Sequence, residues 1–400
     1  MFLSIPADRR VPLADSRDTV FHLGKGQRRS AFGDRLSAGA SAGKTKSYEP
    51  SPFAVLTVGL YQTLGVKACD MKIVIPGGSG QVGTVLARTF VADGHEVVVL
   101  GRKTWPTLPA SEQADAGSVR HVEWDGETMG RWTTELDGAD VVINLAGRSV
   151  NCRYGSRNRR EIKESRVKST RAVGQAIAEA THPPRVWLQA STATIYAHRY
   201  DAPNDEATGI MGGNESNSPD TWRFSIDVAK SWEQAANEAV TPRTRLVLLR
   251  SAITMSPDRG GAFDYLLRLV RWGLGGKHGD GRQFVSWIHD RDFVRAIYWL
   301  IEHDLSGPVN LASPNPLPNI EFMRELQNAW GIRIGLPAME WMLEIGTFLM
   351  RSESELVLKS RRVIPGRLLA SGFEFEFPAW VAAAQDLCDR WKAIQRPDQS

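Results

Sequence analysis

The stretch Met71-Lys-Ile-Val-Ile-Pro-Gly-Gly-Ser-Gly-Gln-Val-Gly83 joins a short apolar segment to a glycine-rich turn. Residues 73–75 are branched aliphatic, which predicts a buried strand, and an apolar helical pattern follows from Thr84. A strand, a glycine turn and a helix in this order leave backbone N–H groups open at the helix N-terminus, where a pyrophosphate can sit. The stretch therefore predicts the first strand and helix of a nucleotide-binding α/β fold.

The glycines of this turn have the spacing Gly-x-x-Gly-x-x-Gly, which differs from the Gly-x-Gly-x-x-Gly dehydrogenase fingerprint. Side chains in such a turn would block the approach of a phosphate, so glycine is needed there for steric reasons. An ordinary strand-turn-helix without a ligand is the alternative, because one glycine triplet is weak evidence. The candidate cofactor-binding residues of the turn are Gly77, Ser79, Gly80, Gln81, Val82 and Gly83.

The composition is that of a soluble globular protein with one large or two ordinary domains: 400 residues, 42% hydrophobic and 24% charged. Cys69, Cys152 and Cys388 are too few and too scattered for a disulfide framework or a zinc site, and the eight histidines show no ligand spacing. No apolar run approaches the ~18 residues of a membrane helix. We therefore expect a cytoplasmic protein without a metal site or a membrane segment.

The net charge of +4 is confined to residues 1–70. Of the 49 Lys/Arg and 45 Asp/Glu, ten and six lie there, which leaves 39 of each in residues 71–400. A neutral folded part argues against a nucleic-acid partner. Residues 1–70 lack a lasting period and are expected to be a disordered extension. Either they are a targeting segment, or they precede the true start at Met71, which we favour because the first strand begins there.

A second buried strand is expected at residues 95–100. In a nucleotide-binding βαβ unit, the residue after this strand meets the adenosine ribose, and an acid there accepts from the 2′-OH of NAD. This chain has Arg102 and Lys103 instead. Because two cations suit a 2′-phosphate, we predict NADP(H) as the preferred cofactor. NAD(H) remains the second choice. The alternative for Arg102 and Lys103 is a solvated pair at a strand end that binds no phosphate.

Two more strand ends are candidates for cofactor contact. Residues 119–124 predict a third strand, and Asp125 after it can either bond an adenine amino group or form an Asx turn. Residues 139–147 predict a buried strand that ends in Asn144-Leu145-Ala146-Gly147. The small residues of this end let a backbone approach a cofactor closely. Glycine-bearing ends on two strands are more specific for a nucleotide site than one.

Five further motifs follow in order along the chain. They are Asn144–Val150, Lys163–Thr170, Lys230–Glu233, Gly273–Gly276 and Gly279–His289. Together they resemble the atypical branch of the short-chain dehydrogenase/reductase (SDR) superfamily known as the epimerase or NAD-dependent epimerase/dehydratase family. Members of this branch end in a small domain of unknown function, which residues 338–387 resemble. The resemblance covers about residues 71–392.

The resemblance implies a Rossmann-type, doubly wound parallel α/β sheet with a smaller, mainly helical C-terminal substrate domain. We expect a cofactor-binding domain at residues 71–312, which includes insertions of the substrate domain, and a small C-terminal domain at residues 313–400. Many SDRs are dimers, so the resemblance also allows a homodimer. It places Leu145, Ala146 and Gly147 under the cofactor, and it adds Thr170 and Lys230 as cofactor contacts. A solvated helix position is the alternative for Lys230.

Residues 185–196 resemble the Ser-Ser-x-x-x-Tyr segment of extended SDRs, in which a hydroxyl group orients the substrate oxygen. Thr192 falls at that position beside Ser191, and the resemblance implies that it polarises the substrate. Tyr196 is a second catalytic candidate, with a packing role as the alternative. The Tyr-x-x-x-Lys pair of SDR catalysis is missing, because no tyrosine of the chain has Lys four residues later. Alignment with the helix of extended SDRs puts Ser225 at the position of the tyrosine and Ala229 at the position of the lysine.

The C-terminal half gives weaker signals. The loop at residues 272–283 is glycine-dense, so it predicts either an anion nest or, more simply, a hairpin turn at Asp280-Gly281. Val285 stands where nucleotide-sugar SDRs commonly have a diphosphate-binding Arg, which weakens the case for such a substrate. Asp290 or Asp292 is expected to cap the helix that follows. Residues 339–350 have helical spacing and predict a core helix.

These features leave two classes of function. The first is an NADP(H)-binding atypical SDR with oxidoreductase or epimerase-type activity on an unknown small molecule, and Ser191, Thr192 and the glycine-rich loop favour it. The second is a non-catalytic NADP(H)-binding regulator or scaffold, and the missing Tyr-x-x-x-Lys pair favours it.

Overall fold

The computed structural model describes residues 71–102, 119–216, 218–332, 336 and 359–395. The predicted extension at residues 1–70, the core helix expected at 339–350 and the cofactor candidate Lys103 lie outside these described residues.

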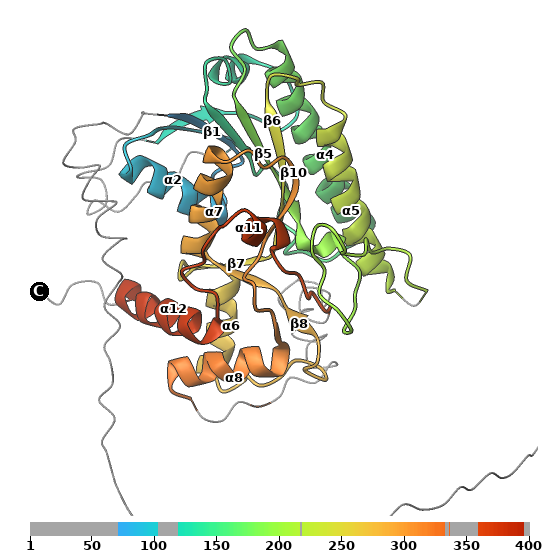
Figure 1. The fold of residues 1–400 in the computed structure, drawn as a ribbon, viewed down its shortest axis with the longest axis vertical. Coiled ribbons are helices and arrows are strands. Elements are labelled where there is room, and N and C mark those ends of the chain that lie inside the picture. Colours follow the sequence, from blue (N-terminus) through green and yellow to red (C-terminus); the bar gives the residue numbers. More distant parts are fainter. Residues whose placement is uncertain (1–70, 103–118, 217, 333–335, 337–358, 396–400) are drawn as a thin grey trace, which may run out of the picture. The chain divides into compact units, whose positions relative to one another are not determined.

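A seven-stranded parallel sheet forms the centre of the larger lobe (Figure 1). Its strands lie in the order β10-β6-β5-β4-β1-β2-β3. They are β1 (Lys72–Pro76), β2 (Glu96–Gly101), β3 (Arg120–Glu123), β4 (Val141–Asn144), β5 (Val186–Thr192), β6 (Arg245–Ser251) and β10 (Gly307–Leu311). The strand order reverses between β1 and β4, and ligands of such sheets bind at this switch point, beside the carboxyl ends of the strands.

Helices cover both faces of the sheet (Figure 1). Ile73 and Ile75 of β1 belong to the core that includes α2 (Gln81–Ala92) and α7 (Asp290–Glu302). Val74 belongs to the opposite core, which includes α4 (Ser156–Glu179) and α5 (Asp220–Asn237). Because strand side chains alternate between faces, a continuous aliphatic run suits a strand buried on both sides. The doubly wound parallel sheet predicted from the sequence is confirmed.

A smaller lobe has its own hydrophobic core. Its helices are α6 (Ala262–Arg271), α8 (Asn319–Trp330) and α12 (Trp380–Gln395). Its short strands are β7 (Ile253–Met255) paired with β9 (Trp287–His289), and β8 (Phe284–Val285) paired with β11 (Leu317–Pro318). Within this core, Trp380 stacks on Phe322 and meets Trp287 edge to face. The helices come from the C-terminal half of the chain, as predicted.

Two local predictions about this half are wrong. Gly281 has φ +76° and forms a turn with Asp280, but no hairpin follows, because β8 pairs with β11 instead of a preceding strand. The N-cap of α7 is His289, whose Nδ1 accepts from the Arg291 N–H at 3.2 Å. The carboxylate of Asp292 instead accepts from two backbone N–H groups of residues 376–377.

His278 gives the smaller lobe a dependence on pH. It is 1% exposed, and burial lowers its pKa to about 4. Its ring is therefore neutral in the folded chain at pH 5, whereas the ring in the unfolded chain, with a pKa of about 6.5, is protonated. Stability from this group is complete above pH 6.5 and is lost as the pH falls toward 4. We expect this loss to lower the free energy of unfolding by about 2 kcal/mol as the pH falls from 7 to 5.

Urea unfolding of the wild type and of His278→Gln at pH 7 and pH 5 measures how much His278 contributes to the pH dependence of the free energy of unfolding. The variant should lose about 2 kcal/mol less than the wild type over that interval. His182→Gln removes an exposed ring and should leave the interval unchanged. Equal losses in the wild type and His278→Gln would contradict the assignment. Burial also lowers the pKa of His198 and His289, so part of the loss remains in every variant.

Candidate functional site

The turn between β1 and α2 is shaped by glycine. Gly77 has φ +75°, and a Cβ atom there would lie 2.5 Å from the Cα of Ala146 on the neighbouring strand end. A Cβ on Gly83 would lie 2.3 Å from the Gly78 carbonyl oxygen, so Gly83 lets the helix pack against the turn. α2 begins without a side-chain cap and without an acid in its first turn. Its N-terminus therefore presents uncapped backbone N–H groups and a positive dipole end.

A cleft of about 600 Å³ opens at the carboxyl ends of β1, β2 and β4, beside this helix N-terminus. We call it the strand-end cleft. It is lined by Gly77, Ser79, Gly80, Leu100, Gly101, Arg102, Trp124, Asp125, Gly126, Glu127, Leu145, Ala146, Gly147, Arg148, Glu161, Glu164, Ser165 and Lys168. Its place at the switch point of the sheet is where doubly wound folds bind nucleotides.

The strand-end cleft brings together eight of the predicted cofactor-binding residues. They are Gly77, Ser79, Gly80, Arg102, Asp125, Leu145, Ala146 and Gly147. Gln81, Val82 and Gly83 do not line it and form the first turn of α2. Thr170 and Lys230 do not line it either. Thr170 is fully buried and accepts from the Trp232 indole N–H at 3.0 Å, and Lys230 donates to the Gly212 carbonyl oxygen at 2.7 Å.

One face of α4 forms a wall of the cleft that the sequence reading missed. Glu161, Glu164, Ser165 and Lys168 stand three or four residues apart, which puts them on one helix face. The sequence spacing predicts that these residues share a helix face, but it does not predict which part of the fold that face contacts. The Lys168 ammonium pairs with Glu127 across the cleft at 2.7 Å.

Arg102 and Asp125 lie at the far side of the cleft. Arg102 is exposed and makes no ion pair within the described residues. The Asp125 carboxylate accepts from the backbone N–H groups of Glu127 and Thr128, each at 2.8 Å, and from the Thr128 hydroxyl at 2.6 Å. These bonds, the hydroxyl bond above all, lower the pKa of Asp125. The Asx turn is therefore present, and Asp125 also lines the cleft.

Thr192 stands at the end of β5, half-buried, as the cap of a short 3-10 turn, η2 (Ala193–Ile195). Its hydroxyl donates to Oγ1 of Thr194 at 3.1 Å and accepts from the Thr194 N–H at 3.2 Å. Two buried cations from the C-terminal segment reach the same turn. Lys359 donates to the Thr194 carbonyl oxygen at 2.9 Å, and Arg361 Nε donates to the Thr194 hydroxyl oxygen at 3.3 Å.

Tyr196 has a packing role in this structure. It is 2% exposed, and its hydroxyl donates to Asn310 Oδ1 at 2.9 Å and accepts from Arg250 at 3.0 Å. Burial raises the pKa of the phenol, which disfavours a phenolate further. The structure therefore favours the packing alternative for Tyr196 over the predicted catalytic role, because its hydroxyl is bonded on both sides inside the core.

A buried ion pair contacts the end of β5 through Ser191. Arg250 of β6 makes two bonds of 2.8 Å to the Glu233 carboxylate on α5. Ser191 donates to the same carboxylate at 2.6 Å. Ala229, at the position of the missing SDR lysine, is fully buried on the same helix. The site thus has a rigid polar support but no tyrosine-lysine acid–base pair.

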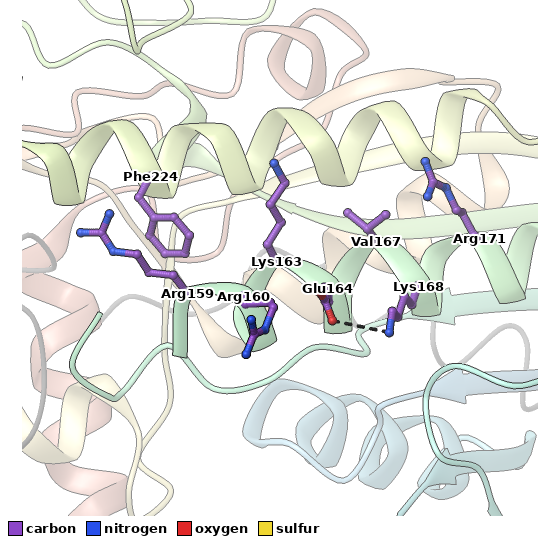
Figure 2. Close-up of a pocket in the computed structure, with 8 residues that line it drawn as sticks. All are labelled: Arg159, Arg160, Lys163, Glu164, Val167, Lys168, Arg171 and Phe224. Carbon is purple, nitrogen blue, oxygen red and sulfur yellow. Dashed lines mark ion pairs between the residues drawn. The ribbon is translucent and has the colours of Figure 1, made fainter. Parts of the chain in front are cut away.

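A second groove, of about 490 Å³, follows α4 beside α5 (Figure 2). It shares Glu164 and Lys168 with the strand-end cleft, so the two hollows meet on α4. Carboxylates hold most of its cations, as Asp227 holds Lys163 at 2.7 Å. Arg160 is exposed and makes no ion pair within the described part of the chain.

Within the residues that the structure describes, no group of three or more His, Cys, Asp or Glu side chains is placed to hold a metal ion. None of the described helices is both long enough and apolar enough to span a bilayer.

Known proteins resemble the chain over most of the described residues. The epimerase family protein SDR39U1 of Bos taurus is 30% identical over 322 residues, which is 79% of this chain and 99% of the relative. An epimerase family protein of Staphylococcus haemolyticus is 30% identical over 331 residues, covering 80% of this chain and 99% of its own.

Two solved structures have the same fold. Human SDR39U1 (isoform 2), solved with NADPH, has a TM-score of 0.67 at 28% identity and covers 80% of this chain and 99% of its own. A nucleoside-diphosphate sugar epimerase from Corynebacterium glutamicum has a TM-score of 0.60 at 26% identity, covering 87% of this chain and 68% of its own.

Family models agree with these relatives and with the ordered motifs. The NAD dependent epimerase/dehydratase family matches residues 73–312, and a domain of unknown function, DUF1731, matches residues 340–387. The first match spans more than half of the chain. The chain therefore belongs to the NAD-dependent epimerase/dehydratase family and includes the DUF1731 domain that follows in the atypical epimerase branch.

Proposed function

We propose that the chain binds NADP(H) in the strand-end cleft and acts as an oxidoreductase or epimerase-type enzyme on a small molecule. The observation that supports the cofactor most directly is Arg102 at the end of β2, without a carboxylate partner in the described residues. A free guanidinium at this place suits a 2′-phosphate, whereas a 2′-OH calls for an acid. Human SDR39U1, a relative by sequence and fold, was solved with NADPH.

The residues present fit the cofactor. Gly80 is the N-cap of α2, and a Cβ there would meet only the Gly77 carbonyl oxygen at 3.8 Å, so a phosphate can approach the helix N-terminus. Leu145, Ala146 and Gly147 form an uncharged wall at the end of β4, in which Ala146 and Gly147 are small. When bound, the nicotinamide would supply the hydride chemistry, and the protein would bind and orient the reactants.

Removal of the Arg102 charge tests the cofactor assignment. We expect Arg102→Ala to weaken NADPH binding by about tenfold to a hundredfold, because a charge-assisted bond to a phosphate contributes about 1.5–3 kcal/mol. NADH binding should change little, since NADH has no 2′-phosphate. Calorimetric titration of both proteins with both cofactors is the measurement. Failure of the wild type to bind either one would reject the cofactor proposal, and equal losses for both cofactors would reject the role of Arg102.

For the reaction itself, Thr192 is the best-placed group. Thr192 is half-buried at the end of β5, on the nicotinamide side of a doubly wound sheet, whereas Tyr196 is buried. The Thr192 hydroxyl proton goes to Thr194 in this structure and would have to turn from Thr194 to a substrate oxygen. The small-molecule substrate is bound, in this proposal, between that strand end and the smaller lobe. The rival function is a non-catalytic NADP(H)-binding regulator, which the missing tyrosine-lysine pair favours.

Turnover of bound NADPH with a fractionated metabolite pool separates the two functions. If the chain is an enzyme, Thr192→Val should lower that turnover by about a hundredfold, the usual effect of removing one oriented donor. Thr192→Ser keeps the hydroxyl and should keep most of the activity. NADPH affinity should be the same in all three proteins. Tight NADPH binding without turnover in any fraction would favour the regulator.

A further inference from the structure

Arg166 on α4 differs from its neighbours, because its guanidinium turns inward to the loop that follows β4. It is half-buried. Its Nη1 donates to the carbonyl oxygens of Arg148 at 2.9 Å and of Ile162 at 3.0 Å. The Trp232 ring of α5 lies 4.9 Å from the guanidinium carbon. The guanidinium is thus held between two helices and the loop, next to an aromatic face.

This guanidinium lies directly behind the wall of the strand-end cleft. A Cβ on Gly147 would lie 3.1 Å from Arg166 Cγ and 3.2 Å from its Cζ. Gly147 itself lines the cleft, so a single backbone unit separates the charge from the cleft. The backbone of the next residue, Arg148, is bonded on both sides. Its carbonyl oxygen accepts from Arg166, and its N–H donates to the Ser165 hydroxyl oxygen at 2.9 Å.

The charge of Arg166 has no carboxylate within ion-pair distance among the described residues. Other cations of this wall are paired, Arg148 with Glu161 and Lys168 with Glu127. Burial lowers the pKa of Arg166 to about 10, so it keeps its proton at neutral pH. The two carbonyl oxygens and the Trp232 ring offset part of the cost of this partly desolvated charge, and an anion bound in the cleft would offset more of it.

The lining of the cleft does not supply enough positive charge for a polyanionic cofactor. Its carboxylates, Asp125, Glu127, Glu161 and Glu164, outnumber its cations, Arg102, Arg148 and Lys168. NADPH would bring a pyrophosphate and a 2′-phosphate into this lining. Arg102 stands at the end of β2, where the adenosine ribose binds, and Arg148 and Lys168 are already paired with carboxylates, so an unpaired cation near the middle of the cleft would add to the attraction of the α2 N-terminus for the pyrophosphate.

We propose that Arg166 is an electrostatic positioning residue for the dinucleotide: from behind Gly147 its charge stabilises the pyrophosphate, and its bond to Arg148 keeps the cleft wall in place. The inference rests on the proposed NADP(H) function. Gly147 follows β4, which neighbours β1 at the switch point, whereas Arg102 follows β2. Arg166 therefore serves the part that NADPH and NADH share, and its effect is the same for both cofactors.

The test uses the full chain and three variants: Arg166→Met, Arg166→Lys and, as a matched control, Arg160→Met. Arg160 is on the same helix, exposed and outside the lining of the strand-end cleft (Figure 2). Titration with NADPH and with NADH gives the affinities, and thermal unfolding without cofactor reports any structural damage. We expect Arg166→Met to weaken both cofactors about tenfold. Arg166→Lys should recover most of this loss, and Arg160→Met should bind like the wild type.

The outcomes separate charge from structure. Recovery in Arg166→Lys, even if both Arg166 variants melt at the same lowered temperature, supports the electrostatic role, because lysine keeps the charge but not the fork of the guanidinium. Arg166→Lys binding as weakly as Arg166→Met would overturn it in favour of a purely structural role. Wild-type affinity in Arg166→Met, or a loss for NADPH alone, would also overturn it. If the wild type binds neither cofactor, the proposed function fails instead.

Discussion

Gly77→Ala is expected to lower the free energy of unfolding by about 3 kcal/mol or more. Two costs combine there. The backbone has φ +75°, and the new Cβ would lie 2.5 Å from the Cα and 2.6 Å from the nitrogen of Ala146. Both opposing atoms are backbone at the end of the buried strand β4, so neither can move aside as a flexible side chain would. Urea unfolding of the two proteins measures the difference.

Gly80→Ala is the matched control, since it adds the same methyl group three residues later. Its Cβ would meet only the Gly77 carbonyl oxygen at 3.8 Å, at φ −79°, so stability should change by less than about 1 kcal/mol. NADPH affinity should nevertheless fall at least about tenfold, because the methyl group would stand at the helix N-terminus where the pyrophosphate approaches. A stable Gly77→Ala would contradict the steric account, and full NADPH affinity in Gly80→Ala would place the phosphates elsewhere.

The strand ends of the cleft could be read from the sequence because their signals are local. The aliphatic run at residues 73–75 and the turn glycines act within a dozen residues, and so does the small-residue end at Asn144–Gly147. Steric demands on a glycine and the period of a buried strand depend little on the rest of the fold. Eight candidate residues accordingly line one cleft in the structure.

The remaining parts of the site depend on contacts between distant segments. Arg361 and Lys359 reach Thr194 across 167 and 165 residues, and no local pattern predicts such a contact. The same holds for Tyr196, whose hydroxyl partners lie 54 and 114 residues away. Its position near Thr192 in the sequence predicts substrate contact, whereas these tertiary hydrogen bonds favour packing.

The cap of α7 shows the limit of propensity. Asp is a favoured N-cap residue, so Asp290 or Asp292 was the natural expectation. In the structure, Asp290 pairs with Arg390 of α12 at 2.8 Å, and Asp292 binds the backbone ahead of that helix. Both carboxylates therefore join α7 to the C-terminal segment, and the cap falls to His289. A side chain that favours a helix N-cap can instead make a tertiary contact, because that contact stabilises the folded chain more than the cap would.

Arg250→Met is expected to lower the free energy of unfolding by about 3–5 kcal/mol, since it leaves the Glu233 carboxylate buried without its counter-ion. Arg250 is 4% exposed and Glu233 is 7% exposed. The two bonds to Glu233 raise the pKa of Arg250 even though burial opposes this, which reports how strongly the pair is coupled. The Ser191 hydroxyl would remain as a donor to Glu233, but one neutral hydrogen bond cannot replace a bidentate guanidinium.

A double-mutant cycle in urea isolates the pair. Arg250→Met combined with Glu233→Gln removes both charges, so it should be less destabilised than Arg250→Met alone by about 1–3 kcal/mol. Arg171→Met breaks the exposed pair with Glu238 and should cost less than about 1 kcal/mol. Additive losses in the cycle would contradict the coupling. A coupled pair would mean that the support of Ser191, which precedes Thr192, depends on the charge pair between Arg250 and Glu233. If Thr192 acts as proposed, turnover and the stability of the core should then fall together in Arg250→Met.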